Sequence, residues 1–257
     1  MEYLSVEEAR VQKGLRLVLT IGGPGPWSET AKGFFQVKKL EFAPVLQEGG
    51  GENRALLEWT GQTLAPVAIF DDEPPLSGIS DILWLAERLA PEPRLIPEDL
   101  RERVSMFGLL REITGQHGLA WSRRLVMLAG NLARQSPGPA REFTESFAKK
   151  FRLTAEAVEP ARRRVVEILE FLVLRLREQR ESGRRFFVGD QLSGVDIAWA
   201  TFAAMFDPLP EDLCPMPRGL RRMYTEKDPQ VLAALDPILI EHRDTIYRDF
   251  LALPLDF

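Results

Sequence analysis

The first 90 residues alternate between the apolar repeat of a strand and that of a helix. Residues 15–21 carry Leu or Ile at every second position, which predicts a strand. The turn at 22–26 is rich in glycine and proline, and apolar side chains then recur at helical spacing from residue 27 to about 39. The chain therefore begins with a strand, a tight turn and a helix.

Two further strands are predicted at 42–46 and 65–70, with a short helix between them. Helical spacing returns at 79–89. Pro74 and Pro75 stand where another strand would fit. Because proline is tolerated only at the edges or starts of strands, we expect that strand to be short.

The pattern changes at about residue 97, where strand signals disappear and long helical periods begin. This change divides the chain into an N-terminal extension at 1–13, an α/β domain at 14–90 and an all-helical domain at 97–257. Ser193 and Asp196 have the spacing of a capping box, which predicts the start of a buried helix.

Composition narrows the class of protein. The 257 residues are 45% hydrophobic and 28% charged, and a net charge of −5 argues against a protein held to nucleic acid by a positive field. The N-terminus lacks the basic and apolar regions of an export signal, and no stretch approaches the roughly 20 apolar residues that cross a bilayer. We expect a cytoplasmic protein with no nucleic-acid or membrane partner.

Few residues are available for metal or thiol chemistry. Cys214 is the single cysteine, and with His117 and His242 it cannot complete a tetrahedral zinc site. No metal is expected. Cys214 has no basic or histidine neighbour in sequence that would lower its pKa, so we interpret it as an ordinary thiol, and we expect surface or capping roles for the two histidines.

Three local motifs share one resemblance. They are Gly25-Pro26-Trp27-Ser28 at the start of the first helix, Ala65-Pro66 before the third strand, and Gly189-Asp190 followed by Ser193 and Asp196-Ile197. Together with the domain order, they resemble the glutathione S-transferase superfamily. The resemblance implies a thioredoxin-like domain followed by a helical bundle.

The resemblance also implies a catalytic position at the first helix, where many members have Cys or Ser before the proline. Gly25 stands there without a side chain. The helix N-terminus at Pro26 could still hold a thiolate and lower its pKa, and Ser28 is the hydroxyl that we expect to stabilise it. Trp27 is interpreted either as a wall of the substrate pocket or as core.

Glutathione itself would bind beside this helix. In the family, a cis-proline loop pairs with the tripeptide backbone, which assigns that role to Ala65 and Pro66. Ser77 and Gly78 stand where the family has an acid and a serine for the γ-glutamyl carboxylate, although Ser77 is equally suited to cap the next helix. Gln62 resembles a residue that contacts the glycine end.

Phe107, Trp121 and the segment after Cys214 are candidates for a hydrophobic substrate pocket, and each is equally consistent with core. The resemblance predicts a homodimeric transferase of detoxification that transfers glutathione to a small hydrophobic electrophile, or uses it to reduce one. The alternative is a non-catalytic binding or assembly module with the same fold. Gly25 and Gly78 favour the module, and Ser28, Ser77 and Ala65-Pro66 favour the enzyme.

Overall fold

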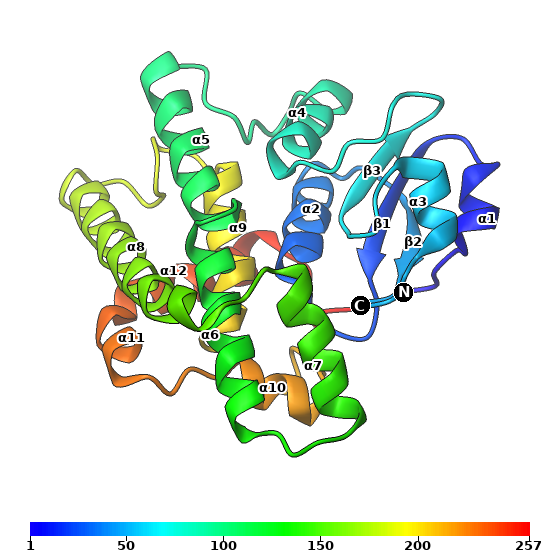
Figure 1. Ribbon diagram of the computed structural model, residues 1–257. Coiled ribbons are helices and arrows are strands. Elements are labelled where there is room, and N and C mark those ends of the chain that lie inside the picture. Colours follow the sequence, from blue (N-terminus) through cyan, green and yellow to red (C-terminus); the bar gives the residue numbers. More distant parts are fainter.

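A small sheet at one end and a bundle of helices at the other make up the computed structural model, which describes all 257 residues (Figure 1). The sheet has the order β2-β1-β3. Strand β1 (Leu15–Thr20) runs parallel to β2 (Ala43–Gln47) and antiparallel to β3 (Val67–Phe70). The three strands lie within two residues of the predicted positions.

Strand β1 is buried along almost its whole length because helices cover both faces of the sheet. Leu17 and Leu19 point to the face covered by α2 (Pro26–Val37) and α4 (Ile79–Leu89). Val18 points to the opposite face, where it packs in one cluster with residues of α1 (Val6–Arg10) and α3 (Arg54–Thr60). The two sets of side chains alternate as the strand repeat requires.

The predicted N-terminal extension is part of this packing. Leu4 forms a parallel bridge with Val45 of β2, and α1 buries Val6 and Ala9 against the sheet. Ser5 begins α1 with a complete capping box. Residues 1–13 therefore fold onto the α/β domain.

Two details at α4 concern the sequence predictions. Helix α4 begins at Ile79 and its N-cap residue is Gly78, so the expectation that Ser77 is the N-cap residue was wrong. The short strand expected before it is reduced to a single bridge between Leu76 and Ala68, in agreement with the effect of Pro74 and Pro75.

The remaining helices form the second domain, as Figure 1 shows. They are α5 (Leu100–Thr114), α6 (Leu119–Arg134), α7 (Pro139–Lys150), α8 (Ala155–Glu181), α9 (Gly194–Phe202), the 3₁₀ turn η1 (Ala203–Met205), α10 (Arg218–Tyr224), α11 (Pro229–Ala234) and α12 (Pro237–Phe250). Helix α9 is completely buried between α2, α5 and α12. None of the helices has both the length and the apolar character to span a membrane.

The start of α9 confirms the predicted capping box. Asp196 is fully buried, and its carboxylate accepts hydrogen bonds from the backbone N–H groups of Ser193 and Phe187 at 3.0 and 2.9 Å. His242 Nε2 lies 2.9 Å from the same carboxylate. A surface role for His242 is thus wrong, because the ring is buried and links α12 to the start of α9.

Candidate functional site

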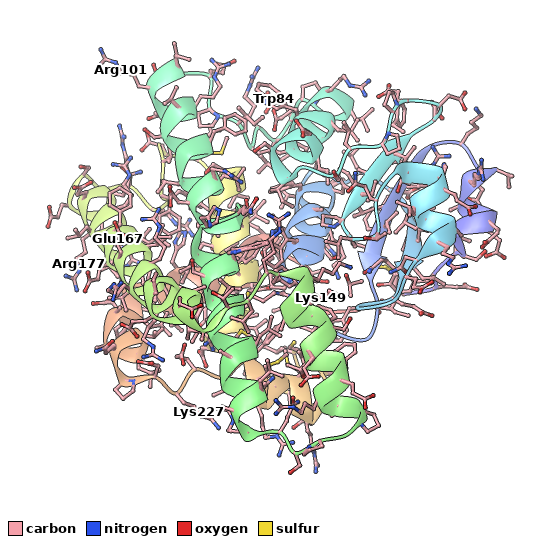
Figure 2. All side chains as sticks on the ribbon, viewed as in Figure 1. Trp84, Arg101, Lys149, Glu167, Arg177 and Lys227 are labelled. Carbon is pink, nitrogen blue, oxygen red and sulfur yellow. The ribbon has the colours of Figure 1, made fainter.

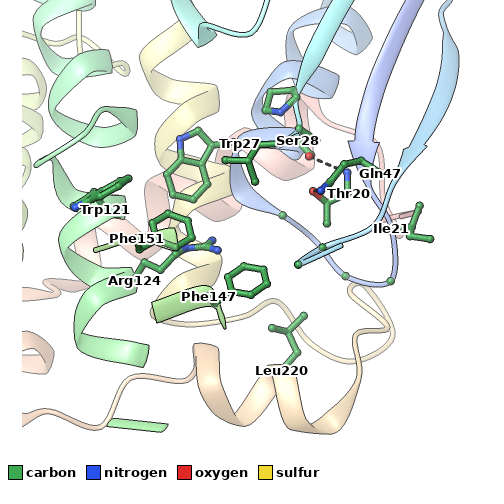
Figure 3. A pocket seen from close by; sticks show the side chains of 18 of the residues that line it. Thr20, Ile21, Trp27, Ser28, Gln47, Trp121, Arg124, Phe147, Phe151 and Leu220 are labelled. Carbon is green, nitrogen blue, oxygen red and sulfur yellow. Dashed lines mark hydrogen bonds between the residues drawn. The ribbon is translucent and has the colours of Figure 1, made fainter. Parts of the chain in front are cut away.

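A cavity of about 460 Å³ lies between the two domains. Its N-terminal wall consists of the end of β1, the start of α2 and the loops before β3 and α4. Helices α6 and α10 and the end of α7 form the opposite wall (Figure 3). The turn between β1 and α2, which the sequence predicts as the candidate site, therefore lines this cavity.

Most of the predicted site residues meet in this cavity. The lining includes Trp27, Ser28, Gln62, Ala65, Pro66, Ser77 and Trp121. Pro26 and Gly78 do not line it: Pro26 is buried in the first turn of α2, and Gly78 lies behind Ser77 as the N-cap of α4.

Phe107 also lies elsewhere, so its assignment to the pocket is corrected. Its ring stacks on Trp84 of α4 with the centroids 5.8 Å apart. The reason is the helical repeat: this face of α5 meets α4, whereas the helix reaches the cavity only at its last residue, Thr114.

Ser28 lies on the N-terminal side of the cavity, in the first turn of α2. Its Oγ accepts a hydrogen bond from the Thr20 N–H at 3.2 Å, and no group of the chain accepts the proton of its own hydroxyl (Figure 3). Thr20, the last residue of β1, uses its hydroxyl to donate to Gln47 Oε1 at 2.8 Å. Ser28 can thus donate its free proton to a bound anion.

Gly25 is the N-cap residue of α2 and leaves a small space beside these hydroxyls. An ideal Cβ at Gly25 would lie 3.6 Å from Ser28 Oγ and 3.7 Å from Thr20 Oγ1, which are ordinary contacts. The helix start has no side-chain cap. The Thr20 hydroxyl was missed in the sequence, because only the fold brings the end of β1 next to the start of α2.

The loop before β3 presents an unpaired stretch of backbone. The Ala65-Pro66 bond is cis, as predicted. Neither the amide nor the carbonyl of Ala65 takes part in a backbone hydrogen bond within the chain. Since Ala65 lines the cavity, its unpaired backbone can pair with the backbone of a peptide-like ligand.

The opposite wall is mostly apolar and aromatic. Trp27 belongs to both the wall and the core, because its indole N–H donates to the Thr114 carbonyl at 2.8 Å and its ring packs edge-on against Phe202. Trp121 packs against Phe151 at a centroid distance of 5.0 Å. These side chains offer a large apolar surface for contact with an apolar ligand.

One charged residue lines the cavity, and the sequence analysis missed it. The guanidinium of Arg124 lies over the Trp27 ring at 4.9 Å and over the Phe151 ring at 5.0 Å. Its neighbour Arg123 points away and is buried in an ion pair with Glu226 at 2.8 Å. In sequence the two arginines differ by one helical position and nothing else distinguishes them.

The predicted segment after Cys214 does reach the cavity, through Leu220, Met223 and Tyr224 of α10. Cys214 itself does not line the cavity, and burial raises its pKa to about 11. A buried thiol with a raised pKa is a poor nucleophile, which agrees with its interpretation as an ordinary thiol.

The family comparison concerns the second domain. Residues 155–236 match the model of the glutathione S-transferase C-terminal domain, and this match covers α8 to α11. No curated protein sequence matches the chain detectably.

Solved structures share the whole fold at low identity. A glutathione S-transferase of Methylobacterium radiotolerans, in complex with glutathione sulfonate, is 17% identical over 93% of both chains with a TM-score of 0.62. One of Methylobacillus flagellatus with glutathione bound is 14% identical over 91% of this chain and 95% of that chain, with a TM-score of 0.64. The yeast prion protein Ure2p in complex with glutathione is 17% identical over 87% and 98%, with a TM-score of 0.56. Residues 155–236 thus match the glutathione S-transferase C-terminal domain, and the chain as a whole has the fold of these glutathione S-transferases, a thioredoxin-like domain followed by a helical domain.

Proposed function

We propose that the protein binds reduced glutathione along the N-terminal wall of the cavity and transfers it to a small hydrophobic electrophile, or uses it to reduce one. The observation that carries the proposal is the Ser28 hydroxyl, whose free proton lies beside the cavity at the start of α2. Three structures with the same fold contain glutathione or its sulfonate, which supports this choice of ligand.

In this mechanism, each group of the wall has a separate task. Ser28 and the partial positive charge of the α2 N-terminus stabilise the thiolate. The free amide and carbonyl of Ala65 pair with the tripeptide backbone. Ser77 receives the γ-glutamyl carboxylate at the start of α4, and Gln62 contacts the glycine end. The sulfur then attacks the electrophilic atom of a substrate held by the helical wall, and the bond to the leaving group breaks as the new bond to sulfur forms. In a reduction, a second glutathione attacks the sulfur of the adduct, so that glutathione disulfide and the reduced substrate leave.

The second candidate function is a non-catalytic binding or assembly module. Gly25 favours it, because no side chain stands at the family's catalytic position. Ure2p, whose solved fragment is described as a nitrogen regulation fragment, has the same fold. Both functions predict a folded protein, and only the enzyme requires a stabilised thiolate.

The Ser28→Ala variant tests the proposal, with the exposed helical residue Ser105→Ala as its control. Calorimetry measures glutathione binding, and the ultraviolet absorbance of the thiolate measures the pKa of the bound thiol. A hydrogen bond to a charged group contributes about 1.5–3 kcal/mol, so losing it should raise that pKa by about 1 unit or more. An unchanged thiol pKa would contradict the role of Ser28, and no binding to the wild type would favour the module.

We also propose that the protein is a cytoplasmic homodimer that acts in detoxification. An exposed apolar face runs over α4 and α5, where Trp84, Leu100 and Val104 are 47%, 66% and 64% exposed. Charges of both signs border it, because Glu98 lines a hollow together with Trp84, and Arg101 follows Leu100 on α5 (Figure 2). A twofold interface places the same patch of two subunits face to face. Positive and negative side chains around this patch can then pair with each other across the interface, which suits a second copy of the chain.

A further inference from the structure

Arg124 is a half-buried cation without an anionic partner. It forms no ion pair or hydrogen bond with any carboxylate or carbonyl of the chain, and its Nε is buried with no hydrogen-bond partner. The neutral hydroxyl of Tyr224 is the polar group that faces the guanidinium. Burial lowers the pKa of Arg124 without discharging the side chain, since a guanidinium stays protonated in proteins.

The adjacent Arg123 shows which partners an arginine with a structural role has in this fold. Arg123 is held by Glu226 at 2.8 Å, and its Nε donates to the Met205 carbonyl at 2.9 Å. An unpaired buried charge is costly, whereas a paired one is compensated. Arg124 has the faces of Trp27 and Phe151 and the neutral Tyr224 hydroxyl, and none of these carries a negative charge (Figure 3).

The surroundings of Arg124 favour a negative charge. No acidic side chain lines the cavity, so an anion that enters would meet no repulsion from a carboxylate there. Figure 3 shows the guanidinium directed from α6 into the cavity. Around it the wall is apolar, with Trp121, Phe147 and Leu220.

We infer that the second substrate is an aromatic or apolar organic acid whose carboxylate binds Arg124. The planar guanidinium offers the parallel donors that a carboxylate accepts, and the Tyr224 hydroxyl can donate to the same group. The apolar body of the ligand then packs against the aromatic side chains of the helical wall. This inference rests on the proposed function, because it names the substrate class of that site.

Direct binding tests the inference without turnover. The probes are 2-naphthoate and 2-naphthamide, which have nearly the same shape and differ in charge. Charge-assisted hydrogen bonds are about twice as strong as neutral ones, so the wild type should bind the acid at least about tenfold more tightly. Arg124→Met should bind both compounds equally, and Arg124→Lys should keep part of the preference.

Arg134→Met is the matched control, because this exposed residue lies on the same helix and outside the cavity. It removes one positive charge and should leave the preference unchanged. Arg124→Met should also unfold at the same or a higher temperature than the wild type, since it removes an unpaired charge. Arg123→Met should unfold at a lower temperature, because it leaves Glu226 buried and unpaired.

Two results would overturn the inference. The first is a wild type that binds the acid and the amide equally, and the second is a preference for the acid that survives in Arg124→Met. If Arg124→Met in the second case also binds glutathione more weakly, Arg124 is assigned to a carboxylate of the tripeptide instead. A preference for the acid in a protein that binds no glutathione would reject the proposed function and leave the anion site standing.

Discussion

Gly25 offers the sharpest test of how the start of α2 works. The backbone there has a φ of −65°, which every residue type adopts, and an added Cβ would meet nothing closer than 3.6 Å. Serine at this N-cap position can accept a hydrogen bond from the amide of Ser28 at the third helical position. Gly25→Ser should therefore fit without strain and supply the missing cap.

The change in stability follows from two contributions. Replacing glycine where the backbone is unstrained gains about 0.4–1 kcal/mol through the unfolded state, and serine exceeds glycine as an N-cap by a few tenths of a kcal/mol. Gly25→Ser should thus raise the free energy of unfolding by about 0.5–1.5 kcal/mol. Gly25→Ala gains the first contribution and caps poorly, so the serine variant should exceed it by about 0.5–2 kcal/mol.

The same serine adds a hydroxyl at the position where the family has its catalytic residue. With its lone pair used for the cap, its proton is free for the sulfur of glutathione. We expect the pKa of the bound thiol to fall by about 1 unit in Gly25→Ser, which corresponds to about 1.4 kcal/mol, and to stay unchanged in Gly25→Ala.

Urea unfolding and a pH titration of the bound thiolate measure these two effects. Equal stability of Gly25→Ser and Gly25→Ala would show that no cap forms at this helix start. Equal thiol pKa values in all three proteins would show that the sulfur does not lie at the N-terminus of α2, and the assignment of Ser28 would fail with it.

Three further predictions concern other parts of the chain. Asp196→Ala leaves two buried backbone N–H groups without an acceptor, so the free energy of unfolding should fall by about 3–5 kcal/mol in denaturant titrations; a loss below about 1 kcal/mol would contradict the role of the capping box. The pKa of Cys214 is raised to about 11 in the fold, so the native state holds its proton where the unfolded chain releases it, and stability should decline from about pH 9 to 11; the decline should be smaller in Cys214→Ala, and an equal decline would refute this assignment. Trp84→Glu should turn the proposed dimer into a monomer in light scattering, whereas a charge at exposed Phe171 on α8 should not; a dimer that survives Trp84→Glu would exclude this face.

The fold was predictable because the local signals are strong. The Leu and Ile residues of 15–21 identify a strand by alternation, and the three glycines and two prolines of 22–26 end it. Ser193 and Asp196 predict their own hydrogen bonds, since both partners lie within one helical turn. Local signals do not predict contacts between distant residues, as His242 shows. Its partner Asp196 is 46 positions away, and only the packing of α12 on α9 brings the two together.

The N-terminal wall of the site was predictable through motifs, because its residues lie at the ends of predicted elements. The helical wall was not. Helical spacing places Phe107 on an apolar stripe but does not say which neighbour that stripe meets, and it meets α4. The difference between Arg123 and Arg124 is of the same kind: one position along α6 turns the side chain by about 100°, from Glu226 to the cavity.

The two walls of the cavity have separate roles in the proposed recognition of the ligand. In the proposed enzyme, the start of α2 supplies the catalytic chemistry, and the structure leaves one hydroxyl there with a free proton. In the same proposal the helical wall supplies selectivity, because one position along α6 determines whether an arginine pairs with Glu226 or faces the cavity. The unpaired guanidinium of Arg124 is a cost in stability that the fold does not require, since Arg123 and Glu226 show that a paired arrangement exists one residue away. Such a residue is explained most simply by a ligand that brings the missing charge.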